Sequence, residues 1–154
     1  MTNTELIENL YTAFSNGNVD KMTACYHKDI VFQDPVFGTL KGERAIKMWE
    51  MLLSKQTEST KISFSNIQTT SQQGSANWRA EYIYGKKNRK VINIISAEFK
   101  FSDGKIIEHI DQFNLWKWTQ QALGFSGLLL GWSPFMQNKI RKTITLKLDK
   151  FINK

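Results

Sequence analysis

The chain has 154 residues, which is the length of one domain and enough to bury a hydrophobic core. Hydrophobic residues make up 41% and aromatic residues 12%, so we expect rings to dominate a core or a pocket. The net charge of +7 is scattered apart from a run at residues 86–90 and a basic C-terminal end. This scatter argues against a nucleic-acid-binding protein, which concentrates its positive charge on one face.

Several further classes of protein are disfavoured by what the sequence lacks. Cys25 is the single cysteine, so there is no disulfide framework and no set of zinc ligands, and we predict no metal and no cofactor. The first residues lack the basic flank and apolar stretch of a signal peptide. The apolar run at residues 128–130 is far too short to span a membrane, so we expect a cytoplasmic protein with neither a membrane nor a nucleic-acid partner.

The first third of the chain has the pattern of helices. Thr2 and Glu5 form a capping box that begins the first helix, and apolar residues then recur at helical spacing. A second short helix is expected from about Asn18, and a short strand at residues 30–32. Gly42 begins a third helix with one apolar face.

From about residue 61 the apolar period changes from helical spacing to two. Strand-like runs cover residues 61–70, 75–84, 90–101 and 106–116, with turn-forming residues between them. Helices followed by a meander of long strands predict an α+β domain. Its single antiparallel sheet would wrap around the early helices and bury one face.

Four polar residues stand out against this pattern. Alternation along the last strand puts His109 and Asp111 on an otherwise apolar face, and Asn93 has the same position on the strand before it. Adjacent strands bring these three into one patch, where they either satisfy one another as core contacts or address a ligand. Asp34, before Pro35 at a strand end, is either a turn former or an acid/base group.

Two segments resemble a known family. Residues 32–46 contain FQDPVFG and LKGERAI, and residues 99–106 read FKFSDGKI. The residues of interest that follow are His109, Asp111, Phe113 and Trp116. Over about residues 2–118 the chain resembles the ketosteroid isomerase and SnoaL-like polyketide cyclase branch of the nuclear-transport-factor-like superfamily. The resemblance implies a cone-shaped α+β fold, a cystatin-like barrel, which hosts isomerases, cyclases, hydrolases, dehydratases and binding proteins.

The resemblance also implies roles for single residues. Asp34 matches the general base of the isomerases, in which a Tyr and a protonated Asp hold the enolate oxygen. Ala97 stands where that second Asp is required, and Tyr11 lies one residue from the position of the Tyr, so the isomerase oxyanion hole is absent or rebuilt. Asp111 lies on the strand where SnoaL-like cyclases place an acid/base Asp.

The C-terminal segment is distinct from the rest. Residues 124–132 form an apolar loop with three glycines, and Ser133 begins a helix with one apolar and one basic face. The stretches WKWTQQALG and GLLLGWSP are similar to a bacterial subset of the superfamily with a C-terminal helical extension. We divide the chain into a ketosteroid isomerase/SnoaL-like domain at 1–118 and a docked segment at 119–154. The segment has three candidate docking sites, namely the pocket mouth, a partner subunit and a membrane surface; we expect the first, with the loop as a lid.

We therefore predict a cofactor-free enzyme that transfers a proton on a small hydrophobic compound, as an isomerase, cyclase or hydrolase. Asp34 would be the base, and Asp111 with His109 the acid/base and orienting pair. The predicted ligand-binding residues are Asn93, Tyr11, Trp49, Trp78, Phe99 and Phe113. The alternative is a non-catalytic protein that binds a small hydrophobic ligand in the same pocket. We also expect a homodimer through the outer face of the sheet, because the aromatic row in residues 78–84 would be an association surface if it points outward.

Overall fold

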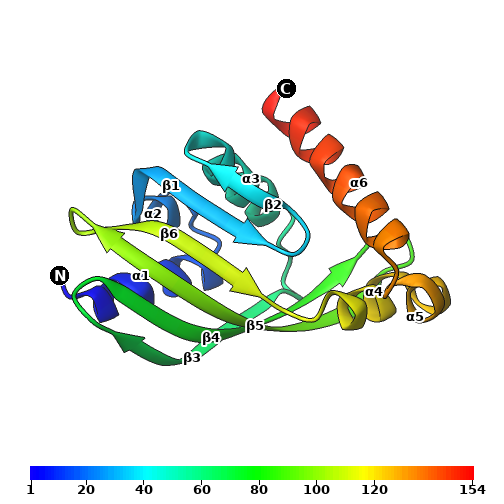
Figure 1. Cartoon of the computed structure of the whole chain (residues 1–154), viewed down its shortest axis with the longest axis horizontal. Helices are drawn as coiled ribbons and strands as arrows, with labels where there is room; N and C mark the ends of the chain where they lie inside the picture. Colours follow the sequence, from blue (N-terminus) through cyan, green and yellow to red (C-terminus); the bar gives the residue numbers. More distant parts are fainter.

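A computed structural model describes all 154 residues and shows six helices arranged around one six-stranded sheet (Figure 1). In chain order the elements are α1 (Asn3–Ser15), α2 (Val19–Thr23), β1 (Tyr26–Asp34), β2 (Gly38–Lys41), α3 (Glu43–Ser54), β3 (Lys61–Thr69), β4 (Gln73–Tyr84), β5 (Arg89–Ser102), β6 (Lys105–Gln112), α4 (Leu115–Leu123), α5 (Phe125–Leu130) and α6 (Pro134–Ile152). The first three helices pack against one face of the curved sheet, which confirms the predicted α+β class.

The strands lie in the order β2-β1-β6-β5-β4-β3. All neighbouring pairs are antiparallel, as predicted, except β1 and β6, which run parallel. This one parallel pair is possible because the long connection from β1 to β6 includes α3 and the whole β3–β5 meander. It places the last residues of β1 beside the middle of β6, with Phe32 opposite His109.

The helix starts follow the side chains that cap them. Thr2 accepts a hydrogen bond from the Glu5 amide (3.1 Å) and begins α1, which confirms Thr2 as the N-cap. Ser133 accepts from the Met136 amide (3.2 Å), with Pro134 at the first position of α6. These caps satisfy amides that have no partner inside the helix, so the sequence sets these two boundaries.

Aromatic rings fill much of the core between the helices and the sheet. Tyr11 of α1 stacks on Phe64 at a centroid distance of 5.5 Å, and Phe14 meets Trp49 of α3 edge-to-face at 5.1 Å. Such pairs add to the stability that their buried area provides. These two contacts tie α1 to β3 and to α3.

The structure corrects several of the predicted elements. The strand expected at residues 30–32 extends over Tyr26–Asp34, and β2 was not predicted. The last strand ends at Gln112 rather than near residue 116, because the Asn114 side chain accepts from the Lys117 amide (3.0 Å) and begins α4. The expected apolar loop at residues 124–132 contains a short helix, α5. A methyl group on Gly127 or Gly131 would overlap Thr119 of α4, so these glycines permit a contact that the sequence pattern did not indicate.

The C-terminal helix α6 lies beside α3 (Figure 1). Ile140 and Leu148 are buried, and Arg44 of α3 pairs with Asp149 at 2.7 Å. Arg141 also donates to the Pro35 carbonyl oxygen (2.8 Å), which ties α6 to the end of β1. None of the helices combines the length and the hydropathy needed to span a membrane.

Candidate functional site

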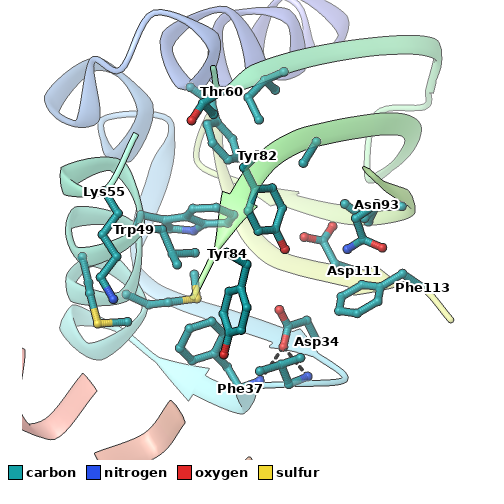
Figure 2. A pocket seen from close by; sticks show the side chains of 18 of the residues that line it. Asp34, Phe37, Trp49, Lys55, Thr60, Tyr82, Tyr84, Asn93, Asp111 and Phe113 are labelled. Carbon is teal, nitrogen blue, oxygen red and sulfur yellow. Dashed lines mark hydrogen bonds between the residues drawn. The ribbon is translucent and has the colours of Figure 1, made fainter. Parts of the chain in front are cut away.

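A cavity of about 230 Å³ lies between the concave face of the sheet and α3 (Figure 2). Of its 25 lining residues 18 are hydrophobic, so the polar side chains that reach it are few. For comparison, an apolar cavity of about 150 Å³ holds benzene. The cavity therefore has room for a small ring compound, which the few polar groups would orient.

Asp34 is the last residue of β1 and lines the cavity. Its Oδ1 accepts hydrogen bonds from the amides of Val36 (2.9 Å) and Phe37 (2.6 Å), while its other oxygen has no protein partner (Figure 2). Burial raises the pKa of the Asp34 carboxyl to about 7, against the lowering effect of those two amides and of Arg141; the charge of Asp111 raises it further. A carboxyl with this pKa can accept and donate a proton near neutral pH.

Asp111 on β6 is the second carboxyl of the cavity wall. Its Oδ1 lies 2.8 Å from His109 Nε2 and accepts a hydrogen bond from the indole N–H of Trp78 (3.2 Å). Both bonds go to the same oxygen, so Oδ2 has no protein partner. Asp111 is thus fixed by two contacts and keeps one oxygen available for a ligand.

A chain of buried side chains continues behind Asp111. His109 Nδ1 lies 2.7 Å from the Tyr26 hydroxyl, which accepts from the indole N–H of Trp49 (2.8 Å). If Tyr26 donates to Nδ1, the His109 proton sits on Nε2 and is donated to Asp111, and each atom is satisfied. His109 is fully buried and is not part of the cavity lining, so it orients Asp111 rather than facing a ligand.

Two tyrosines of the aromatic row that the sequence analysis had assigned to a dimer surface line the same cavity (Figure 2). Tyr82 accepts a hydrogen bond from the indole N–H of Trp118 (2.8 Å), and no protein group accepts the proton of Tyr82. Burial raises the pKa of Tyr82 to about 12, so its hydroxyl stays protonated and can donate. Tyr84 and the amide of Asn93 also reach the cavity without a hydrogen-bond partner in the protein.

The aromatic row of β4 therefore points into the cavity and not outward. Trp78 and Tyr82 line it, whereas Arg79 and Glu81, which alternate with them, do not. The aromatic row therefore no longer supports the homodimer prediction. The pairing of β4 with β5 explains this orientation. Ala80 lies opposite Asn93, which the sequence analysis had assigned to the concave face, so Trp78 and Tyr82 share that face.

The predicted site residues fall into two groups. Those that line the cavity are Asp34, Trp49, Trp78, Asn93, Asp111 and Phe113. Tyr11, Phe99 and His109 do not reach it, which corrects the placement of Tyr11 and Phe99 as ligand-binding residues. Tyr11 is fully buried beneath Trp78, and Phe99 packs on the His109 ring at 4.6 Å. Ala97 pairs with Asp111 in the sheet and is buried, so this position offers no hydrogen-bond donor to a ligand.

Two lysines complete the lining of the cavity. Lys55 follows α3 and Lys147 belongs to α6, and neither forms an ion pair with a carboxylate. Partial burial lowers the pKa of Lys55, and the charges of Lys147 and Lys154 lower it further. No group of three His, Cys, Asp or Glu side chains is placed to hold a metal ion.

Several solved structures share this fold at low sequence identity. A protein with a ketosteroid isomerase-like fold from Catenulispora acidiphila DSM 44928, in complex with trimethylamine, superposes with a TM-score of 0.66 at 15% identity, over 86% of this chain and all of the other. An LEH-like epoxide hydrolase of M. tuberculosis gives 0.63 at 19% identity, over 82% and 94% of the two chains. TerC co-crystallised with polyporic acid gives 0.62 at 16% identity, over 73% and 91%.

At these identities the likeness establishes the fold alone, and no protein of curated function matches the sequence. The family is established by sequence. The profile of the SnoaL-like domain matches residues 7–109, which is more than half of the chain and includes β1, the cavity wall of β4 and β5, and His109. The chain therefore belongs to the SnoaL-like domain family and has the ketosteroid isomerase-like fold of its structural neighbours.

Proposed function

We propose that this protein is a cofactor-free enzyme that transfers a proton on a small hydrophobic compound bound in the cavity. One observation carries the proposal: the carboxyl of Asp34, whose pKa is raised to about 7, opens into a mostly apolar cavity. Perturbed carboxyls in such surroundings are typical of acid/base catalysts. The structures that share this fold include an LEH-like epoxide hydrolase, so the fold supports catalysis in at least one protein, although this does not specify the reaction here.

The arrangement suits abstraction of a proton next to a carbonyl group. The free oxygen of Asp34 takes the proton as the C–H bond breaks, and the electron pair moves to the carbonyl oxygen. The hydroxyl of Tyr82 and the amide of Asn93 are the donors that can stabilise the resulting negative charge. Asp34 then returns the proton to another atom of the same compound, which completes an isomerisation or assists ring closure.

Asp111 is the second acid/base group of the proposal. Asp111 lines the cavity and has one oxygen without a protein partner, and His109 and Trp78 hold the carboxyl in place. His109 is a positioning residue in this scheme, because both of its ring nitrogens are engaged inside the protein. Isomerisation, cyclisation and hydrolysis can each be assisted by two acid/base groups, so the reaction type depends on the compound that fits the cavity.

The second candidate is a binding protein without turnover. It is favoured by the same network, since the chain from Trp49 through Tyr26 and His109 to Asp111 is internally satisfied and needs no substrate. In that case the few polar groups of the cavity only orient an apolar ligand. TerC, which has this fold, was crystallised with polyporic acid, a small molecule.

We further propose that the protein is a cytoplasmic homodimer. Ile94 is exposed to 62% on the outer face of the sheet, and an exposed apolar side chain there is a contact site for a second copy. Cys25 is a free thiol, which suits a reducing compartment.

Hydrogen–deuterium exchange separates the two functions without knowledge of the substrate. The protein is incubated in D₂O with a small apolar ketone such as 2-tetralone, and loss of the α-proton signals is followed by NMR. The enzyme should accelerate exchange, and Asp34→Asn should lower the rate by about 100- to 10,000-fold. Asp29→Asn, an exposed carboxyl of the same strand, is the control. Binding of several ketones without faster exchange would support the binding protein instead.

A further inference from the structure

One end of the molecule carries a cluster of large apolar side chains that remain exposed. The members of this cluster, here named the α5 tip, are Phe125, Leu128, Leu129, Leu130, Trp132 and Phe135. Their exposed fractions lie between 48% and 76%, and all of them fall within eleven consecutive residues of α5 and the start of α6. The tip does not line the cavity, so the expectation that this segment acts as a lid is wrong; α6 lines it through Ile144 and Lys147.

The packing of α5 on α4 fixes these apolar side chains in their exposed orientation. Gly127 and Gly131 lie so close to Thr119 that any side chain would overlap it, and Thr119 is fully buried. The indole N–H of Trp116 donates to the Leu128 carbonyl (3.2 Å), and that of Trp132 donates to the Leu129 carbonyl (2.8 Å). The small residues thus face the protein while the large apolar ones face outward, the reverse of what folding alone would favour.

The surroundings of the α5 tip are strongly basic. Residues 84–90, 115–133 and the first two turns of α6 to residue 141 lie toward this end of the molecule, and together they contain seven Lys and Arg residues and no Asp or Glu. The hairpin between β4 and β5 lies at the same end as α4 and α5 (Figure 1), and Arg89 at its base donates to the Gln121 carbonyl of α4 (2.7 Å). Lys86, Lys87 and Lys139 are exposed and have no carboxylate partner.

We propose that this end of the protein docks on the surface of an anionic lipid bilayer. The α5 tip would enter the boundary between headgroups and acyl chains, and the surrounding lysines and arginines would contact the anionic headgroups. Trp, Phe and Leu beside Lys and Arg are the side chains that such an interface favours. This departs from the expectation of no membrane partner, which assumed that the apolar residues of the segment pack on the domain.

Two other occupants fit the surface less well. A second copy of the chain would bring two surfaces of the same positive charge together, which is unfavourable. Single-stranded nucleic acid would suit the cations and rings, but three leucines in the middle of the tip offer no stacking partner for bases. Docking does not depend on chemistry in the cavity. It would, however, hold α4 and α6, which both line the cavity, beside a reservoir of apolar compounds.

Vesicle flotation with the full-length protein tests the proposal. The probes are vesicles of phosphatidylcholine alone and of an equimolar mixture of phosphatidylcholine and phosphatidylglycerol. We expect binding to the mixed vesicles that falls several-fold as salt rises from about 0.05 to about 0.3 M, and weak binding to the neutral ones. The triple variant Leu128→Gln, Leu129→Gln, Phe135→Gln should lose at least about tenfold in partitioning, because each change removes apolar surface available to the bilayer.

A matched pair of single variants shows whether position matters. Leu129 and Leu146 are exposed to 52% and 53%, but Leu146 lies three turns along α6 from the tip. Leu129→Gln should lower partitioning by about threefold or more, and Leu146→Gln should leave it unchanged. Equal losses in both, or no binding to anionic vesicles, would overturn the proposal. So would a stable dimer that Leu129→Gln dissociates, or tighter binding to single-stranded DNA than to vesicles.

Discussion

Replacing Asp34 with Asn should stabilise the protein at neutral and alkaline pH. The pKa of Asp34 is raised from 3.8 to about 7 by burial, so the folded protein holds this proton more tightly than the unfolded chain does. The stability that the protonated form contributes is fully present below about pH 4 and is lost as the pH rises through about 7. Asn stays neutral at every pH, and its side-chain oxygen can still accept from the Val36 and Phe37 amides.

The size of the effect follows from the two pKa values. A tenfold change in proton affinity is worth about 1.4 kcal/mol, so raising the pKa from 3.8 to about 7 costs at most about 4 kcal/mol above neutral pH. Asp34 is only partly buried, and screening through its accessible side lowers this to about 2 kcal/mol. Asp34→Asn should therefore be about 2 kcal/mol more stable than the native chain at about pH 8, and equally stable near pH 3.5.

Urea unfolding followed by tryptophan fluorescence measures these differences. Trp49 and Trp78 are buried in the core, so their emission reports global unfolding. Asp29→Asn, on the same strand but exposed, should change the free energy of unfolding by less than about 0.5 kcal/mol at both pH values. If Asp34→Asn gives no gain at about pH 8, or the same gain at both pH values, then Asp34 does not titrate as argued and the enzyme proposal loses its main support.

Three further predictions concern the buried network, the outer face and the oxyanion position. Tyr26→Phe removes the shared hydroxyl between Trp49 and His109, so it should lower the free energy of unfolding by about 2 to 4 kcal/mol in urea melts, and a neutral result would show that the network is not structural. Ile94→Lys should dissociate the proposed homodimer in sedimentation experiments; a native chain that sediments as a stable 17.9 kDa monomer at micromolar concentration would contradict the dimer. Turnover of Δ5-3-ketosteroids should be poor, because Ala97 stands where a donor worth about 100- to 1000-fold in rate is required, and efficient isomerisation measured by absorbance would refute this.

Several polar residues at or behind the cavity wall could be predicted from strand alternation and turn position in the sequence. Alternation placed His109 and Asp111 on one inward face, and the structure brings them together at 2.8 Å. Asp34 at a strand end before Pro35 is both a turn former and a cavity residue, so the two interpretations of this residue were not exclusive. The sequence did not indicate which of these side chains reaches the cavity. His109 lies one layer behind, because Tyr26 and Asp111 occupy its two nitrogens.

The tyrosines of β4 show what alternation alone cannot decide. Alternation assigns the side chains of a strand to two faces but does not show which face points toward the core. Counting outward from the turn at residues 85–88 pairs Tyr84 with Arg89 and Ala80 with Asn93, and the face of Asn93 then assigns Trp78 and Tyr82 to the cavity. The orientation of α5 had no comparable signal. It depends on the contact of Gly127 with Thr119, which only the packing of two helices reveals.

The buried network links the candidate chemistry to the stability of the fold. Trp49 lies on α3, Tyr26 on β1, His109 on β6 and Trp78 on β4, so Asp111 is held by elements from most of the chain. These contacts all end on one oxygen of Asp111, while Asp34 is held only by the amides of its own turn. The two carboxyls should therefore respond differently to substitution. Asp111→Ala removes the oxygen on which His109 and Trp78 converge and should cost stability, whereas Asp34→Asn should increase it. Asp34 lowers the stability of the fold, and yet two backbone amides hold it in position in an apolar cavity. Catalysis explains this arrangement more easily than folding does.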